Sequence, residues 1–199
     1  MTLDLDEAKV ERNEFGLWLG WTLATAGGML FGFLLTIPLV NVLDLGFARI
    51  IVPILAGILI GFSQWAILRQ YLITSSDWVL AGGAGWAAGY ALGLLLIESL
   101  SGTLLAGIAA YFLFGVIVAL VQWQELRREI PSKLTWVIAN SLGWAAGLWA
   151  SQAALEFFFN DPVIAPVVST AVIAVTSGLV AGAITGIALI WIAGRPETA

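Results

Sequence analysis

The sequence predicts an all-α integral membrane protein, a bundle of six transmembrane helices built from repeated helical hairpins. Hydrophobic residues make up 60% of the 199 residues and charged residues only 11%, whereas a soluble domain usually carries about 25% charged residues. Apolar stretches long enough to cross a bilayer, about 20 residues each, follow one another along nearly the whole chain. An internal repeat relates two of the hairpins that these stretches form.

The chain begins with a polar segment and continues as six apolar stretches. Residues 1–14 are polar and mostly acidic, and we expect them to form a short cytoplasmic segment ahead of one transmembrane domain over 15–195. Each stretch ends where turn-forming or charged residues gather. The six predicted helices, each with the break that ends it, are 17–43 (break 41–46), 49–72 (74–77), 78–98 (99–102), 103–127 (128–132), 134–158 (160–162) and 163–193, which runs into the polar C-terminal residues.

The positions of lysine and arginine predict that both chain termini face the cytoplasm. Basic residues concentrate in the cytoplasmic loops of membrane proteins. With the N-terminus inside, Arg49 is the one basic residue that falls on the outer side of the membrane. The other seven fall on the cytoplasmic side: Lys9, Arg12, Arg69, Arg127, Arg128, Lys133 and Arg195.

The two central hairpins share a sequence pattern at a spacing of 58 residues. Residues 57–98 align without a gap onto residues 115–156, with 14 identities in 42 positions. Shared hydrophobicity does not explain coincident tryptophans, so we interpret the pattern as a repeated helical hairpin. Gly20 and Trp21 resemble the Gly-Trp pair of this unit, and a third hairpin split between the chain ends is a further interpretation. The matched pairs include Gln64/Gln122, Trp65/Trp123, Arg69/Arg127, Trp78/Trp136, Gly85/Gly143, Trp86/Trp144 and Gly89/Gly147.

Small residues recur at every fourth position in several of the predicted helices. Such glycine-zipper faces let helix backbones approach closely, which supplies much of the helix association inside a bilayer. The pattern therefore favours tight bundle packing, with a glycine-lined permeation path as the alternative. The clearest examples are Gly85, Gly89 and Gly93 in one helix and Gly178, Gly182 and Gly186 in another.

Gln64 and Gln122 lie on these glycine faces, each seven residues after a glycine of the repeat. Glutamine in this position most simply makes a hydrogen bond between helices. A contact with a ligand or an ion is the alternative, so both glutamines are candidate site residues.

The tryptophans of the repeat fall at two depths. Trp78 and Trp136 start their predicted helices and are expected in the aromatic belt at the membrane interface. Trp86 and Trp144 follow eight residues later, about 12 Å deeper, where the belt does not explain them. They either fill the space that glycines leave in a neighbouring helix or line a pocket for a flat apolar ligand such as a pigment, quinone, sterol-like lipid or vitamin. Candidate polar contacts for that ligand include Asn140 and Gln152, together with Ser141 and Ser151.

The composition argues against several chemistries. The chain contains no cysteine and no histidine, which removes thiolate and imidazole metal ligands and the usual nucleophile–base pairs. Neither catalytic residues nor a metal site are predicted, and no cofactor can be named. Eight basic against thirteen acidic residues give a net charge of −5, which argues against nucleic-acid binding.

The Gln-Trp-x-x-Leu-Arg turns at 64–69 and 122–127, each followed by Trp-Val and Gly-Trp-x-x-Gly, resemble a loose group of uncharacterised bacterial membrane proteins, often cyanobacterial. The resemblance covers residues 57–147 and assigns no activity. It implies a bacterial inner (plasma) or thylakoid membrane. Beside the lipid bilayer, the expected partner is a lipophilic ligand or another membrane protein.

Three classes of function are compatible with these features. We favour a non-enzymatic membrane protein that binds a lipophilic small molecule or serves as an accessory subunit of a larger membrane complex. The alternative is a transporter component similar to a substrate-capturing membrane subunit. An intramembrane enzyme is the least favoured, because no paired carboxylates or Ser-Lys pair lie within the predicted helices.

Overall fold

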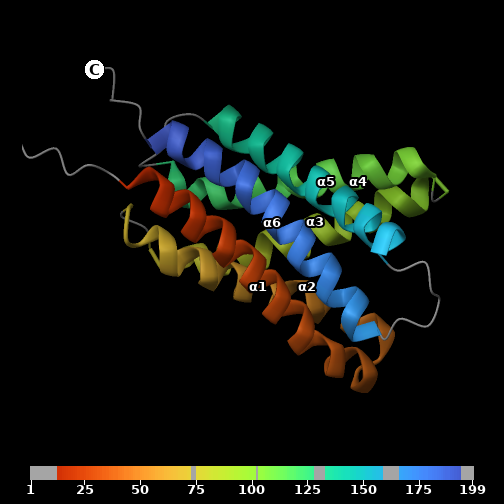
Figure 1. The fold of residues 1–199 in the computed structure, drawn as a ribbon. Coiled ribbons are helices and arrows are strands. Elements are labelled where there is room, and N and C mark those ends of the chain that lie inside the picture. The colour runs from red at the N-terminus through yellow and green to blue at the C-terminus, as the bar shows by residue number, and fades with distance from the viewer. Residues whose placement is uncertain (1–12, 73–74, 102, 128–132, 159–165, 194–199) are drawn as a thin grey trace, which may run out of the picture.

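A computed structural model describes residues 13–72, 75–101, 103–127, 133–158 and 166–193, and these fold into six long helices (Figure 1). The described residues contain helices and short turns and no strand. Most of the polar segment predicted at 1–14 lies outside them. The helices are α1 (Glu14–Val42), α2 (Leu45–Leu68), α3 (Asp77–Ser99), α4 (Leu104–Leu126), α5 (Lys133–Phe158) and α6 (Pro166–Ala193).

The predicted all-α fold with six helices is confirmed. Five helices, all except α5, are long and apolar enough to cross a membrane, so the chain is a multi-pass membrane protein. The helix α5 is equally long, but Asn140, Ser141, Ser151 and Gln152 make it less apolar. Three of these four side chains are buried rather than directed toward the surroundings. That α5 also spans the membrane, and that both termini are cytoplasmic, stay predictions.

The predicted helix boundaries agree with the observed ones to within a few residues, and α2 differs most. It begins at Leu45 rather than at residue 49 because Asp44 caps it. The Asp44 carboxylate accepts hydrogen bonds from the backbone N–H groups of Gly46 at 2.8 Å and Phe47 at 3.3 Å. An aspartate that satisfies these free N–H groups is a preferred start for a helix. The consequence is an extra helical turn, residues 45–48, ahead of Arg49.

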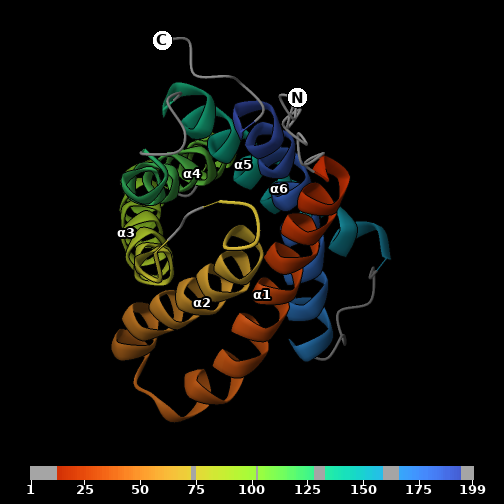
Figure 2. The same cartoon turned by 90° about the vertical axis from the view of Figure 1, so that its left-hand side faces the viewer.

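The six helices form a closed ring in chain order. Each helix packs against the one before and the one after it, and α6 packs against α1, whereas no other pair of described helices brings its backbones close together. Figure 2 shows the helices placed around a common axis. Successive helices run in opposite directions, so the start of α1 and the end of α6 lie together (Figure 1). We call this end of the ring the terminal end and the opposite one the distal end.

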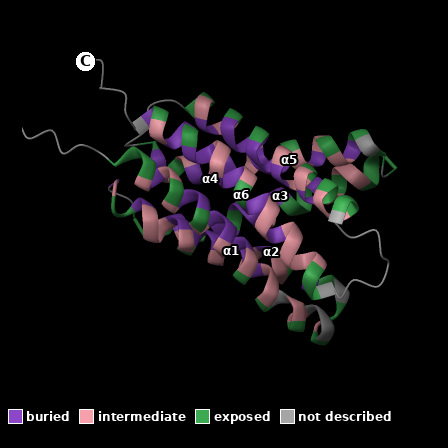
Figure 3. Cartoon of the chain, in the orientation of Figure 1, coloured by how far each residue is buried: buried purple, intermediate pink, exposed green. Residues whose placement is uncertain are grey.

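Side chains fill the ring in layers along its axis. Toward the terminal end lies an apolar cluster that contains Trp21, Trp78 and Trp136. A second cluster, with Trp86 and Trp144 at its centre, follows nearer the distal end. Figure 3 shows that buried residues concentrate in the middle and at the terminal end, while few lie at the distal end. The interior is therefore well packed toward the terminal end and contains fewer buried side chains toward the distal end.

Glycines set the distance between neighbouring helices. A Cβ atom added to Gly115 of α4 would lie 2.6 Å from the Asn140 carbonyl oxygen and 2.6 Å from the Ser141 Cα atom of α5. A Cβ on Gly147 would lie 2.6 Å from the Ser177 carbonyl oxygen of α6. Real Cβ atoms do not approach backbone this closely, so only glycine permits these helix contacts. The packing interpretation of the small-residue faces agrees with these distances.

Candidate functional site

The terminal end of the ring is closed by three tryptophans that contact one another, which we call the terminal tryptophan cluster. Trp21 of α1, Trp78 of α3 and Trp136 of α5 have ring centroids 6.0, 6.1 and 6.3 Å apart. All three are at most 1% exposed. Edge-on or tilted contacts at this spacing stabilise aromatic pairs. The tryptophans come from alternate helices, so they join elements whose backbones do not touch.

This cluster corrects two interpretations of the sequence. The aromatic belt predicted for Trp78 and Trp136 is wrong, because both side chains are fully buried inside the ring. Trp21 lies with these two tryptophans and not with Trp86 and Trp144, which the comparison of Gly-Trp pairs had suggested. Distance along a helix gives depth in the bilayer, but it does not say whether a side chain points outward to lipid or inward.

A polar layer lies on the distal side of the terminal tryptophan cluster. The Gln122 amide Nε2 of α4 donates to the Gln64 oxygen of α2 at 3.4 Å, and the Gln64 Nε2 donates to the Thr25 hydroxyl of α1 at 3.1 Å. The indole Nε1 of Trp21 donates to the Thr185 hydroxyl of α6 at 2.9 Å. These bonds confirm the interhelical role that was favoured for Gln64 and Gln122.

Two members of the terminal tryptophan cluster lack such a bond. The indole Nε1 atoms of Trp78 and Trp136 are buried without a hydrogen-bond partner in the described part of the chain, as are those of Trp65 and Trp123. A buried donor without an acceptor costs about 1–3 kcal/mol. Apolar packing alone therefore holds Trp78 and Trp136 in the cluster. Trp21 is held by apolar packing and by its hydrogen bond to Thr185.

The outer tryptophans of the repeat each lie beside a cation. The Arg69 guanidinium carbon is 4.8 Å from the Trp65 ring centroid, within the range of a cation–π contact. The matching Trp123 instead has the Lys133 ammonium 5.3 Å from its ring. The sequence repeat thus preserves the kind of contact without preserving the residue that makes it.

The second aromatic cluster forms the floor of the distal part of the ring. Trp86 of α3, Phe114 of α4 and Trp144 of α5 have ring centroids 4.9, 5.2 and 5.6 Å apart and stand nearly perpendicular to one another. Trp86 also packs on Gly57, whose added Cβ would lie 2.6 Å from the Trp86 Cβ atom. The interpretation that Trp86 fills the space beside a glycine is confirmed by this contact.

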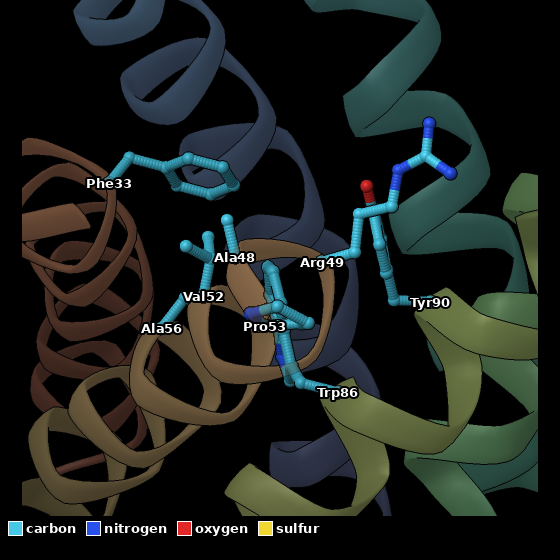
Figure 4. A pocket seen from close by; sticks show the side chains of 8 residues that line it. All are labelled: Phe33, Ala48, Arg49, Val52, Pro53, Ala56, Trp86 and Tyr90. Atoms are coloured by element: carbon cyan, nitrogen blue, oxygen red, sulfur yellow. The ribbon is translucent and has the colours of Figure 1, made fainter. Parts of the chain in front are cut away.

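Two apolar hollows lie on the distal side of this floor, and together we call them the distal hollow. The first has a volume of about 230 Å³ and the second about 180 Å³. Phe33, Trp86 and Tyr90 line both of them. The second reaches from α1 to α5 across the ring, from Met29 to Leu148. The remaining residues of the first hollow, shown in Figure 4, are Ala48, Arg49, Val52, Pro53 and Ala56.

Arg49 and Tyr90 form a polar rim on the first hollow. Arg49 and Tyr90 are exposed, and Figure 4 shows their polar ends extending to the same side of the hollow, away from Trp86. Ala48 and Ala56 are at most 4% exposed and form part of the apolar wall. Concave sites of this kind, largely apolar with few polar groups, are typical of small-molecule sites.

The candidate site residues predicted from the sequence are placed in different surroundings. Trp86 lines the distal hollow, and Trp144 supports it from below through their 5.2 Å ring contact. Gln64 and Gln122 lie in the polar layer, separated from the hollow by the aromatic floor. Asn140 is buried and donates to the Trp136 carbonyl oxygen of its own helix at 3.1 Å. Gln152 is exposed and does not line the hollow.

Several residues that line the hollow were missed by the sequence analysis. Phe33, Pro53 and Tyr90 lie in apolar stretches where they resemble ordinary lipid-facing or packing residues. The one available signal was the charge of Arg49, the single basic residue on its side of the predicted topology. The sequence alone does not show that Arg49 borders a hollow, because the hollow is formed where α1, α2 and α3 meet.

Among the described residues, no group of three or more acidic side chains is arranged to hold a metal ion. Comparison of the chain with family models, with curated proteins and with solved structures gives no match in any of the three.

Proposed function

We propose that the protein is a non-enzymatic membrane protein that binds a lipophilic small molecule in the distal hollow. The observation that carries this proposal is the hollow itself, an apolar space inside a ring of helices with Trp86 at its floor and Arg49 at its rim. An apolar hollow surrounded by lipid attracts apolar molecules from the bilayer, because water inside it would lack hydrogen-bond partners.

The tryptophans give the first test of this proposal. Trp86→Leu together with Trp144→Leu removes the aromatic floor, and we expect the variant to lose a ligand that co-purifies with the unaltered protein. Trp149→Leu is the matched control, because Trp149 is 63% exposed on the outside of α5. The measurement is native mass spectrometry after gentle extraction, with circular dichroism to show that the helices persist.

A second variant removes the space without touching the floor. Val52 lines the first hollow from α2 and is partly buried. Val52→Trp fills much of the first hollow, whose volume is about 230 Å³. The variant is expected to abolish retention of the ligand. If the Val52→Trp protein and the double leucine variant both keep their helices and retain the ligand unchanged, the distal hollow is not its site.

A further inference from the structure

Building on the proposed function, we infer that the occupant of the distal hollow is a long-chain carboxylate, a free fatty acid. Its carboxylate binds Arg49 at the rim and its single hydrocarbon chain extends over Trp86 into the second hollow. Three properties of the hollow lead to this assignment: the charge at its rim, the chemistry of its wall and its size.

The charge at the rim selects an anion. No described carboxylate is paired with Arg49, and Arg49 borders the first hollow directly. The other described basic side chains, Arg69, Arg127 and Lys133, belong to the terminal end of the ring. A guanidinium binds a carboxylate through two parallel N–H···O bonds, which are stronger than neutral hydrogen bonds. Arg49 is thus a cation placed for an anionic head group.

Tyr90 gives the rim a second hydrogen-bonding group. It lines both hollows and is 39% exposed. Its hydroxyl extends to the same side as the Arg49 guanidinium in Figure 4. A phenol donates a hydrogen bond to a carboxylate oxygen without requiring a charge of its own.

The wall below the rim selects a hydrocarbon. The first hollow is lined there by the apolar side chains of Phe33, Ala48, Val52, Pro53 and Ala56. These side chains offer no hydrogen bond, so a polar group of the ligand would be left without a partner and its burial would cost free energy. The part of the ligand inside the first hollow is therefore hydrocarbon. The second hollow is lined mainly by apolar side chains and glycines, with Tyr90 and Tyr111 as its residues that carry a hydroxyl group.

The size of the hollow selects a single chain. A cavity of about 150 Å³ holds one benzene ring, so hollows of about 230 and 180 Å³ each accept little more than a ring or a short length of chain. Pockets for drug-sized ligands measure about 300–1,000 Å³. Phe33, Trp86 and Tyr90 line both hollows, so the two adjoin. A flexible chain can bend from one into the other, whereas a rigid fused-ring pigment or sterol needs one larger space. A lipid with two acyl chains would leave one of them outside.

The experiment compares two ligands that differ in the head group alone. Equilibrium binding of palmitate and of hexadecanol is measured on the full-length protein in lipid nanodiscs, for the unaltered chain and for Arg49→Gln. We expect Arg49→Gln to weaken palmitate binding about tenfold or more, as for loss of a charged hydrogen bond, and to leave hexadecanol binding unchanged. Arg69→Gln, which changes a cation at the terminal end, is the control and should alter neither.

Different results would contradict the carboxylate assignment and the proposed binding function. If Arg49→Gln leaves palmitate binding unchanged, or weakens palmitate and hexadecanol equally, the carboxylate assignment is wrong while binding in the hollow stands. If phosphatidylglycerol displaces palmitate one for one, the occupant is a two-chain lipid and the assignment is also wrong. If Val52→Trp keeps its helices and binds both ligands normally, the distal hollow is not a binding site and the proposed function fails with it.

Discussion

Buried tryptophans of the terminal tryptophan cluster contribute differently to stability, depending on whether the indole N–H has a hydrogen-bond partner. Trp21 and Trp78 contact each other and are both fully buried, but the Trp21 indole donates to Thr185 at 2.9 Å while the Trp78 indole N–H has no partner. Replacement by phenylalanine removes a similar amount of ring surface at both positions. The two variants therefore differ mainly in whether a hydrogen bond is lost.

We predict that Trp21→Phe lowers the free energy of unfolding more than Trp78→Phe does. The expected difference is about 0.5–1.5 kcal/mol, the net contribution of one hydrogen bond. Relief of an unpaired buried donor in Trp78→Phe acts in the same direction. Reversible unfolding in mixed detergent micelles measures both values. Equal destabilisation by the two substitutions would mean that the Trp21–Thr185 hydrogen bond does not contribute.

At the level of helices, the glycine contacts decide which substitutions the ring accepts. Gly115 and Gly107 lie on the same helix, α4, but an added Cβ at Gly115 meets the backbone of α5 at 2.6 Å, while at Gly107 it meets nothing within 4 Å. Gly115→Ala is expected to lower stability by about 1–3 kcal/mol, as overpacking does. Gly107→Ala is expected to be neutral or stabilising by up to about 1 kcal/mol.

Thermal unfolding of the two alanine variants, followed by circular dichroism, checks this prediction. Their helix propensities change equally, so a difference in melting temperature reports the helix–helix contact alone. A Gly115→Ala protein as stable as Gly107→Ala would show that α4 and α5 do not approach each other as closely as described.

The positions of the helices were predictable from the sequence. Which side of each helix points into the ring was only partly predictable. Charged and turn residues interrupt the apolar stretches, which is why five of the six helix starts and ends were found almost in place. Gln64 and Gln122 were correctly expected to bond between helices because they share a face with glycines. The burial of Trp78 and Trp136 was missed, since an apolar helix surrounded by lipid carries no polar face that marks its outward side.

The whole molecule is a ring that closes through α1 and α6, and this closure could not be predicted from local patterns. The glycine contacts repeat around it: an added Cβ would lie 2.6 Å from the Gly82 oxygen at Gly57, from the Asn140 oxygen at Gly115, and from the Ala26 Cα atom at Gly178. Together with the three tryptophans from alternate helices, these contacts support a third hairpin formed by α6 and α1. That hairpin stays a prediction.

The orientation of the ring in the membrane is a prediction that the absence of native cysteine makes easy to check. Gln70 and Ser99 are exposed at opposite ends of the ring. With both termini cytoplasmic, a membrane-impermeant maleimide applied to spheroplasts should label Ser99→Cys at once. Gln70→Cys should react after the membrane is permeabilised. The reverse pattern would contradict the orientation derived from the basic residues.

The distal hollow has an aromatic contact as its floor, and its wall is formed by residues of α1 to α5. Native mass spectrometry of the protein extracted gently from its own membrane tests the hollow most directly. We predict the mass of one chain plus a small, reproducible adduct of an acidic single-chain lipid, and we predict that this adduct is lost in Val52→Trp. A bare chain, or a complex with other polypeptides and no adduct, would contradict it and would favour an accessory subunit instead.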